Sequence, residues 1–282
     1  MILPAICFLA APLLLAAPAD GRRPVAELLR SHEDLSRTAG WTMETVFMDE
    51  GLPIRVLRTE KKGSALWLLA GIHGEEPAPS VAVSLSTAVL ARLDMPVVVL
   101  PLCNPAGYSK GWRYPDSPER GKGHSVGDSD HLLPGKDGKP RLPRPASPQS
   151  AALTAKVLEL ARDYPPVLSV DLHEDDHLSA GYIYSQGPRG CADPAAGAVM
   201  RKMRELGYPI KLSGRTDFDE EIRDGIVCGV QDGSIDELIA SAGGRSVLVV
   251  ETGSMKMGLE RRVRLHRAII GMLPELFKAA AR

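Results

Sequence analysis

The sequence predicts an α/β protein, a three-layer α/β/α sandwich with a mixed, mostly parallel central sheet. Two observations support this prediction. Four short runs are mostly apolar, which is typical of strands buried on both faces. Segments with helical composition separate these runs. Strands that alternate with helices are typical of a parallel sheet covered by helices on both sides.

The predicted elements follow in chain order. The strands are residues 65–70, 97–102, 167–172 and 246–250, and the helices are residues 25–30, 77–93, 147–162, 195–206 and 258–281. Pro77 suits a first helical position, and Ser147 followed by Pro148 is typical of a helix start. Residues 105–147 are rich in Gly, Pro, Ser and charge, and a loop of this length is usually functional or disordered.

The composition is that of an ordinary globular protein with interspersed charges. The 282 residues carry a formal net charge of −1, which argues against a nucleic-acid partner, since such proteins usually present a basic face. Aromatic residues make up 5% of the chain, which argues against a base-stacking platform. No segment after the N-terminus is long and apolar enough to span a bilayer.

The first 19 residues differ from the rest. They carry no charged side chain, residues 6–17 are almost wholly apolar, and Ala17-Pro18-Ala19 has the small-x-small form of a cleavage site. We expect residues 1–19 to be a secretory signal peptide and residues 20–282 to form a single domain in the periplasm or outside the cell. A retained membrane anchor and a wrongly assigned start of the chain are the alternatives.

Three cysteines follow the predicted signal peptide: Cys103, Cys191 and Cys228. Three is an odd number, so at most one disulfide forms and one thiol stays free. No pair has the spacing of metal ligands. We expect all three to be small buried apolar residues.

The segment GIHGEEP, residues 71–77, directly follows a predicted strand and precedes a predicted helix. Open parallel sheets bind ligands at the carboxyl ends of their strands. His73 and Glu76 lie three residues apart, so they can face one point at this junction. An imidazole and a carboxylate are ligands that suit Zn²⁺.

Two further segments place polar groups at strand ends. His173 in SVDLHED and Glu251 in VVETG each follow a buried run, and Asp171 lies where it can orient a ligand from behind. Two histidines and one glutamate leave a position open for water, which is typical of a catalytic zinc site. Glu251 is then free to act as the general base.

The motifs HGEE, NPAG, DLHED and VVETG, in this order, resemble the zinc carboxypeptidase superfamily, which includes the succinylglutamate desuccinylase and aspartoacylase branch. The resemblance implies one Zn²⁺ held by His73, Glu76 and His173, with Glu251 as the catalytic glutamate. It implies a zinc-hydrolase catalytic domain over residues 20–282. Predicted substrate contacts are Asn104 of NPAG, His131 and Arg223.

The sequence departs from the superfamily pattern in two places. Members usually carry an Asn-Arg pair that holds the terminal carboxylate of the substrate, whereas residues 127–131 read GDSDH. Arg113 is therefore the predicted catalytic cation, for the oxyanion or for a substrate carboxylate, and Arg223 is the second choice. The short segment after Glu251 leaves no room for the extra C-terminal domain of the desuccinylase branch, which favours a peptidase.

These features predict an exported zinc hydrolase that cleaves a peptide or amide bond in a peptide or an N-acyl amino acid. Export alone suggests cell-wall peptides as the substrate. One alternative is an N-acyl amino acid deacylase, and another is a catalytically silent protein that binds zinc or a ligand.

A rival metal site uses some of the same residues. Residues 173–177 read HEDDH, which matches the His-Glu-x-x-His motif, in which both histidines bind zinc from one helix. The run of acidic residues and the neighbouring prolines have low helix propensity, which argues against this motif. We expect Glu174 and His177 to lie in a polar loop at the cleft mouth, and His32 and His266 to lie on the surface.

Overall fold

A computed structural model of the chain describes residues 20–119, 121–128, 131–132 and 143–282. The predicted signal peptide, residues 1–19, lies outside the described residues, as does part of the predicted loop 105–147. Within the described ranges, ten strands form one mixed sheet in the order β1-β2-β4-β3-β5-β10-β6-β9-β8-β7.

The centre of the sheet is parallel. Its four strands, in spatial order, are β4 (Val97–Leu100), β3 (Ala65–Ala70), β5 (Pro166–Asp175) and β10 (Ser246–Gly253). Nearly all of their residues are buried, which agrees with the continuous apolar runs in the sequence. All four predicted strands are therefore confirmed.

Short strands flank this centre on both sides. The hairpin β1 (Thr42–Asp49) and β2 (Leu52–Arg58) joins β4 in antiparallel fashion. On the other side lie β6 (Tyr182–Ser185), β9 (Ile226–Cys228), β8 (Glu221–Arg223) and β7 (Ser213–Arg215). The sequence analysis did not predict these six strands.

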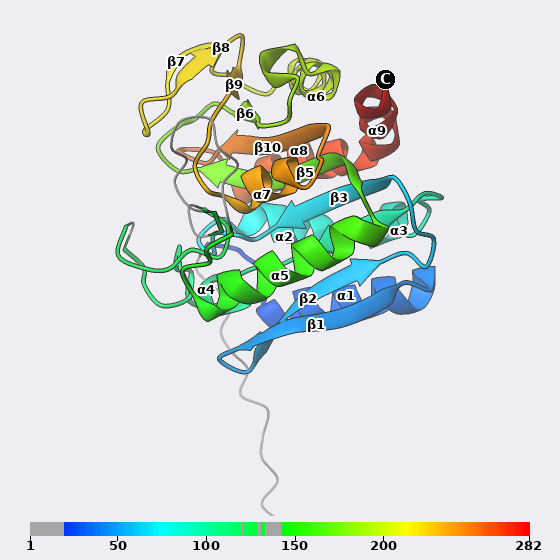
Figure 1. Cartoon of the computed structure of the whole chain (residues 1–282). Coiled ribbons are helices and arrows are strands. Elements are labelled where there is room, and N and C mark those ends of the chain that lie inside the picture. The colour runs from blue at the N-terminus through cyan, green and yellow to red at the C-terminus, as the bar shows by residue number, and fades with distance from the viewer. Residues whose placement is uncertain (1–19, 120, 129–130, 133–142) are drawn as a thin grey trace, which may run out of the picture.

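Helices cover both faces of the sheet, as Figure 1 shows, so the predicted three-layer architecture is confirmed. One face packs against α1 (Val25–Ala39), α2 (Pro77–Ser84), α3 (Thr87–Leu90), α6 (Pro194–Glu205), α8 (Leu259–Gly271) and α9 (Leu273–Ala281). The other packs against α5 (Pro148–Asp163) and α7 (Ile235–Ser241). Ser147 caps α5 by accepting a hydrogen bond from the Ser150 backbone, as predicted.

Several local predictions were wrong. The first helix runs to Ala39 rather than ending at Arg30, because Leu28 and Leu35 bury one of its faces in the core. The predicted helices 77–93 and 258–281 are each two helices. The predicted loop 105–147 contains the short helix α4 (Pro105–Lys110).

Buried polar residues and cysteines also differ from expectation. His32 and His266 are buried rather than exposed. Cys191 and Cys228 form a disulfide that joins the 3-10 turn η1 (Gly190–Ala192) to β9, which is the one disulfide that three cysteines allow, and neither of them is buried as expected. Cys103 is buried and free, as predicted.

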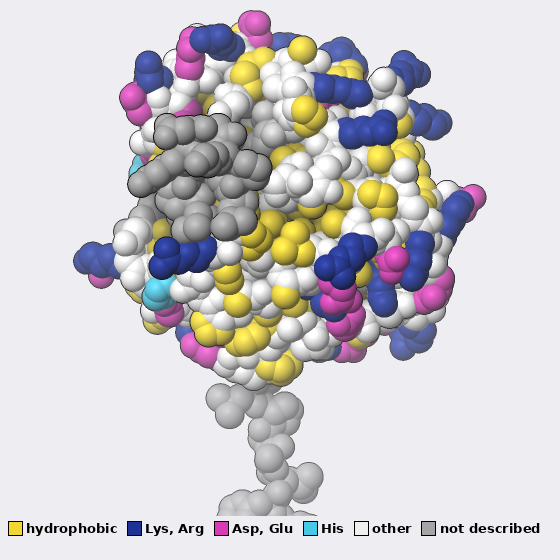
Figure 2. Space-filling model, in the orientation of Figure 1, with side chains coloured by type: hydrophobic (Ala, Val, Ile, Leu, Met, Phe, Trp, Pro, Cys, Tyr) yellow, Lys and Arg dark blue, Asp and Glu magenta, His cyan; other side chains and the backbone are white. Residues whose placement is uncertain are grey.

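The visible surface mixes positive and negative side chains without a basic stripe (Figure 2). In the described part of the chain, no helix combines the length and apolar character needed to cross a membrane.

Candidate metal centre

The candidate site forms at the carboxyl ends of β3, β5 and β10. The loop after β3 carries His73 and ends at Glu76, the N-cap position of α2. This loop packs tightly on α4, because a Cβ atom on Gly74 would lie 2.1 Å from the carbonyl carbon of Gly107. Glycine at position 74 therefore lets this loop, which we call the metal loop, and α4 approach each other.

His73, Glu76 and His173 form the one group of potential metal ligands found among the described residues. Each offers a ligand atom, and these atoms lie within 4.8 Å of one another. All three side chains are buried, and His73 Nδ1 is enclosed without a hydrogen-bond partner. A buried nitrogen left without a partner is costly unless an ion or ligand completes it, so the three residues fit a metal ion.

Carboxylates lie behind both histidines. His173 Nε2 lies 3.3 Å from Asp171 Oδ2, and its Nδ1 lies 3.2 Å from Glu76 Oε2. His73 Nε2 lies 3.1 Å from Asp128 Oδ1. Such partners fix the ring orientation and leave the Nδ1 atoms for a metal, so the predicted position of Asp171 behind the site is confirmed.

Arg113 lies against the same loop, with its side chain buried. Its Nη2 is 2.9 Å from His73 Nε2 and 3.4 Å from Asp128, and its Nη1 is 3.1 Å from Glu75. Burial lowers the pKa of Arg113, but Asp128, Glu76 and Glu75 raise it by more, so the net shift is upward. The structure therefore places a permanent positive charge beside the metal ligands, where Arg113 was predicted to act.

Glu251 lies on β10, in register with His173 on β5 and with Tyr182 on β6. Its Oε2 atom is buried and has no hydrogen-bond partner. Burial raises the pKa of this carboxyl well above its usual value, and Glu76 and Asp175 raise it further, against the opposing effect of His173. A raised pKa makes the carboxylate a stronger base.

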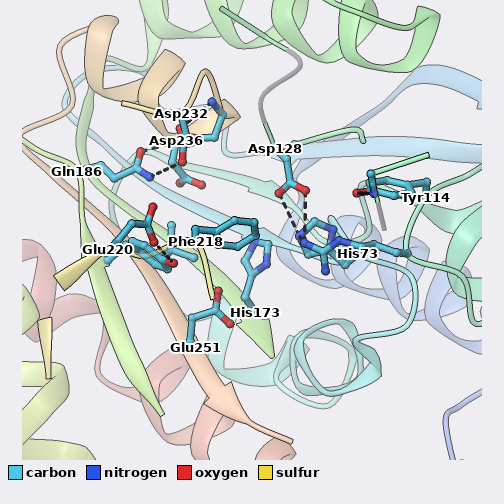
Figure 3. A pocket seen from close by; sticks show the side chains of 16 residues that line it. His73, Tyr114, Asp128, His173, Gln186, Phe218, Glu220, Asp232, Asp236 and Glu251 are labelled. Carbon is cyan, nitrogen blue, oxygen red and sulfur yellow. Dashed lines mark hydrogen bonds and ion pairs between the residues drawn. The ribbon is translucent and has the colours of Figure 1, made fainter. Parts of the chain in front are cut away.

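These groups open into a cavity of about 470 Å³ (Figure 3). His73 and Asp128 lie at one end of it, and His173 and Glu251 lie in the middle. Arg113 also lines the cavity and contacts His73. Gln186, Glu220, Asp232 and Asp236 lie at the far end. Tyr184, Phe218, Ser234 and Val249 also line the cavity. The cavity is large enough for an amino-acid residue of a substrate.

Three predicted substrate contacts do not line this cavity. Asn104 is fully buried beneath it, where its Nδ2 donates to Arg113 O (2.9 Å) and its Oδ1 accepts from Gly107 N (2.8 Å). His131 is fully buried between Thr154 Oγ1 and Val126 O, and burial lowers its pKa to about 4. Arg223 is exposed and pairs with Glu221 at 2.5 Å.

The sequence analysis did not identify Asp128 as a residue of the site, although Asp128 belongs to the GDSDH segment discussed there. Asp128 contacts both His73 and Arg113. A carboxylate in a Gly-rich loop is a weak signal by itself. It becomes informative only once the fold brings this loop to the metal centre.

The structure excludes the rival His-Glu-x-x-His site. Residues 173–175 belong to strand β5, so His173 and Glu174 point to opposite faces. Glu174 accepts a hydrogen bond from Ala78 N (2.8 Å) at the start of α2 and pairs with Arg262. His177 is half exposed, beside Asp217, and takes no part in the ligand group.

Comparison with known proteins identifies the fold. No family model matches the chain, and no curated protein matches its sequence. Among solved structures, a candidate metallopeptidase from Shewanella baltica is similar, with a TM-score of 0.74 and 19% identity over 88% of this chain and 91% of that protein.

Bovine thrombin-activatable fibrinolysis inhibitor matches with a TM-score of 0.68 and 15% identity, over 92% of this chain and 97% of that one. Carboxypeptidase A from Helicoverpa armigera matches with a TM-score of 0.65 and 12% identity, over 93% and 74% of the two chains. The chain therefore has the metallocarboxypeptidase fold, which confirms the resemblance at the level of the fold.

Proposed function

We propose that this chain is a zinc-dependent hydrolase that cleaves a peptide or amide bond. The observation that carries the proposal is the buried group of His73, Glu76 and His173, which opens into a cavity beside the unpartnered carboxyl of Glu251. Two imidazoles and a carboxylate suit zinc and leave a position open. When bound, zinc would act as a Lewis acid toward water and the substrate carbonyl.

The residues of the chain then have distinct roles. Glu251 takes a proton from the attacking water and delivers it to the leaving nitrogen. Arg113, fixed by Glu75 and Asp128, stabilises the negative charge that develops on the carbonyl oxygen. Asp128 and Asp171 hold the two histidine rings in place.

We also propose that the protein is exported to the periplasm or secreted. The apolar, uncharged stretch over residues 1–19 supports this proposal. The Cys191–Cys228 disulfide supports it independently, since disulfides persist mainly in oxidising compartments. Peptides of the cell wall are the substrates that such a location suggests.

The proposed activity is tested with zinc-reconstituted protein and N-benzoyl-glycyl dipeptides as substrates. Glu251→Gln should lower kcat by about 100-fold or more, because the general base is lost. Its zinc content should not change. Glu221→Gln, an exposed glutamate outside the cavity, is the matched control and should keep full activity. A Glu251→Gln variant that retains the parental kcat would rule out this role.

N-acyl amino acid deacylation is the second candidate function. It is favoured by the absence of an Asn-Arg pair in residues 127–131 and by the lining of the cavity, where Arg113 is the one Lys or Arg side chain among the described residues. A carboxypeptidase should need a free C-terminal carboxylate on its substrate. Equal cleavage of a peptide acid and its amide would therefore favour the deacylase or a related amidohydrolase.

A further inference from the structure

The candidate ligand Glu76 lies at the start of α2, where the helix lacks its usual cap. Glu76 is the N-cap residue, but its side chain makes no capping hydrogen bond, and its carboxylate belongs to the ligand group instead. Pro77, the first helical residue, has no N–H, so Ala78 N is the first backbone donor of the helix. This donor needs an acceptor from another part of the chain.

Glu174 supplies that acceptor. Its Oε2 accepts a hydrogen bond from Ala78 N (2.8 Å), which is the contact that an N-cap side chain usually makes. A carboxylate in this place also interacts favourably with the N-terminal end of the helix dipole. The backbone N of Glu174 donates to Glu76 Oε2 (2.9 Å). Glu174 therefore fixes both the start of α2 and the carboxylate of Glu76.

The carboxylate of Glu174 is buried between α2 and α8. A buried carboxylate is costly unless hydrogen bonds and a cation compensate it. Arg262 of α8 is that cation, since its Nη1 pairs with Glu174 Oε1. Its own side chain is largely buried as well, so the removal of either partner leaves an uncompensated charge inside the protein.

Helix α8 is attached to the strands of the metal centre at a second point. His266 lies four residues after Arg262, so the two side chains share one face of the helix. His266 is fully buried, and its Nε2 lies 3.1 Å from Thr252 Oγ1, which donates to the backbone oxygen of His173 (3.3 Å). The position of Arg262 relative to β5 is therefore set by the packing of the whole helix.

We propose that Glu174 and Arg262 are positioning residues of the metal centre. Arg262 holds the carboxylate of Glu174, and Glu174 holds Glu76 in the orientation that binds the ion. Neither residue belongs to the ligand group, and Arg262 does not line the cavity. Each of the three ligands then has a carboxylate that positions it, Asp128 and Asp171 for the histidines and Glu174 for Glu76. The proposal rests on the proposed function for the identity of the centre.

Zinc affinity, measured by competition with a chelator, tests the role of Glu174 without any need for turnover. Glu174→Ala should bind zinc about 10-fold more weakly than the parent chain, because Glu76 loses its support. Glu174→Gln keeps an oxygen that can accept from Ala78 N, so it should lose less affinity than Glu174→Ala. Arg264→Ala removes an exposed arginine from the same helix α8, and this control should bind zinc like the parent chain.

A double-variant cycle tests the role of Arg262. Arg262→Ala should also weaken zinc binding, because the carboxylate of Glu174 loses its cation. Since Arg262 acts through Glu174, the Glu174→Ala, Arg262→Ala double variant should bind zinc no more weakly than Glu174→Ala alone. The absorption spectrum of the Co²⁺-substituted protein reports the geometry around the ion. It should change in both single variants and stay the same in Arg264→Ala.

Urea unfolding of the metal-free variants separates support of the metal centre from support of the fold. A Glu174→Ala variant that loses stability but keeps the parental zinc affinity and Co²⁺ spectrum overturns the proposal. Additive losses of affinity in the double variant overturn the role of Arg262. Weaker zinc binding in Glu174→Ala, together with a parent chain that cleaves no amide substrate, supports the positioning role and contradicts the hydrolase. A parent chain that binds no zinc contradicts both.

Discussion

The carboxylates of Asp171 and Asp128 lie behind the two histidines of the candidate metal centre. Asp171 is completely buried and lies 3.3 Å from His173 Nε2, and Asp128 lies 3.1 Å from His73 Nε2. Both carboxylates face the ring nitrogen that is turned away from the ligand group. They therefore fix the two rings before any ion binds, which lowers the cost of forming the site.

Replacing Asp171 with Asn tests this role. The variant keeps the shape of the side chain but loses its charge, so zinc affinity should fall by about 10-fold or more. Competition with a chelator of known affinity measures the change. Asp163→Asn, which alters an exposed aspartate in a surface ion pair, is the control and should bind zinc like the parent chain. Unchanged affinity in Asp171→Asn would show that Asp171 does not support His173.

Some residues of the site could be predicted from the sequence and others could not. His73, His173 and Glu251 each follow a mostly apolar run, so the end of a buried strand marks them locally. Glu220 and Asp232 follow no such run. They reach the cavity only because β6, β8 and β9 extend the sheet beyond β10, which no local pattern in the sequence reveals.

At the scale of elements, the junction between α4 and the metal loop sets the geometry of the site. Gly74 lies against α4, and Arg22 strengthens the junction by donating from Nη1 to Gly74 O (2.8 Å) and to Tyr108 O (2.7 Å). Asn104 caps α4 and also binds the backbone oxygen of Arg113. The NPAG motif therefore acts beneath the cavity, by positioning Arg113, rather than as a substrate contact.

Replacing Asn104 with Ala should remove this support. The change leaves Gly107 N and Arg113 O buried without their partner, which should cost about 1–3 kcal/mol of unfolding free energy. Urea unfolding measures the loss. Ser109→Ala on the same helix removes an exposed hydroxyl and should change stability by about 0.5 kcal/mol or less. Equal stability of the two variants would contradict the structural role of Asn104.

The parallel centre of the sheet was predictable and its edges were not. Strands buried on both faces are continuously apolar, and this pattern identified all four central strands. In the β1–β2 hairpin, most β1 residues are only partly buried, so no apolar run marks the strand. The Glu50-Gly51 turn, with positive φ at both residues, was the available signal for this hairpin. Strands β7 and β8 have three residues each, which is too short for a recognisable alternation of apolar and polar residues.

At the scale of the whole molecule, the disulfide constrains the strands beyond β10, which carry the far end of the cavity. It joins the turn after β6 to β9, and the sequence separation of its cysteines is 37 residues. Strand β9 connects β6, which carries Tyr184, to β8, which directly follows Glu220. The cross-link therefore stabilises a region that otherwise depends on very short strands.

Opening the disulfide should destabilise the fold. The chain-entropy model gives about 4 kcal/mol for a loop of this size, so a Cys191→Ser, Cys228→Ser variant should unfold at a clearly lower urea concentration. Reductant should produce the same loss in the parent chain. It should also do so in Cys103→Ala, the control that removes the free thiol. A urea midpoint that is unaffected by reductant would show that the disulfide does not contribute to stability.

Zinc content directly tests the assignment of His73, Glu76 and His173 as the metal centre. It is determined for the purified protein and for two variants, His73→Ala and His177→Ala. We predict that the parent chain and His177→Ala bind zinc in a one-to-one ratio and that His73→Ala loses it, because His73 is a ligand and His177 lies outside the ligand group. A His73→Ala variant that keeps its full zinc would contradict the assigned centre, and so would a parent chain that binds none.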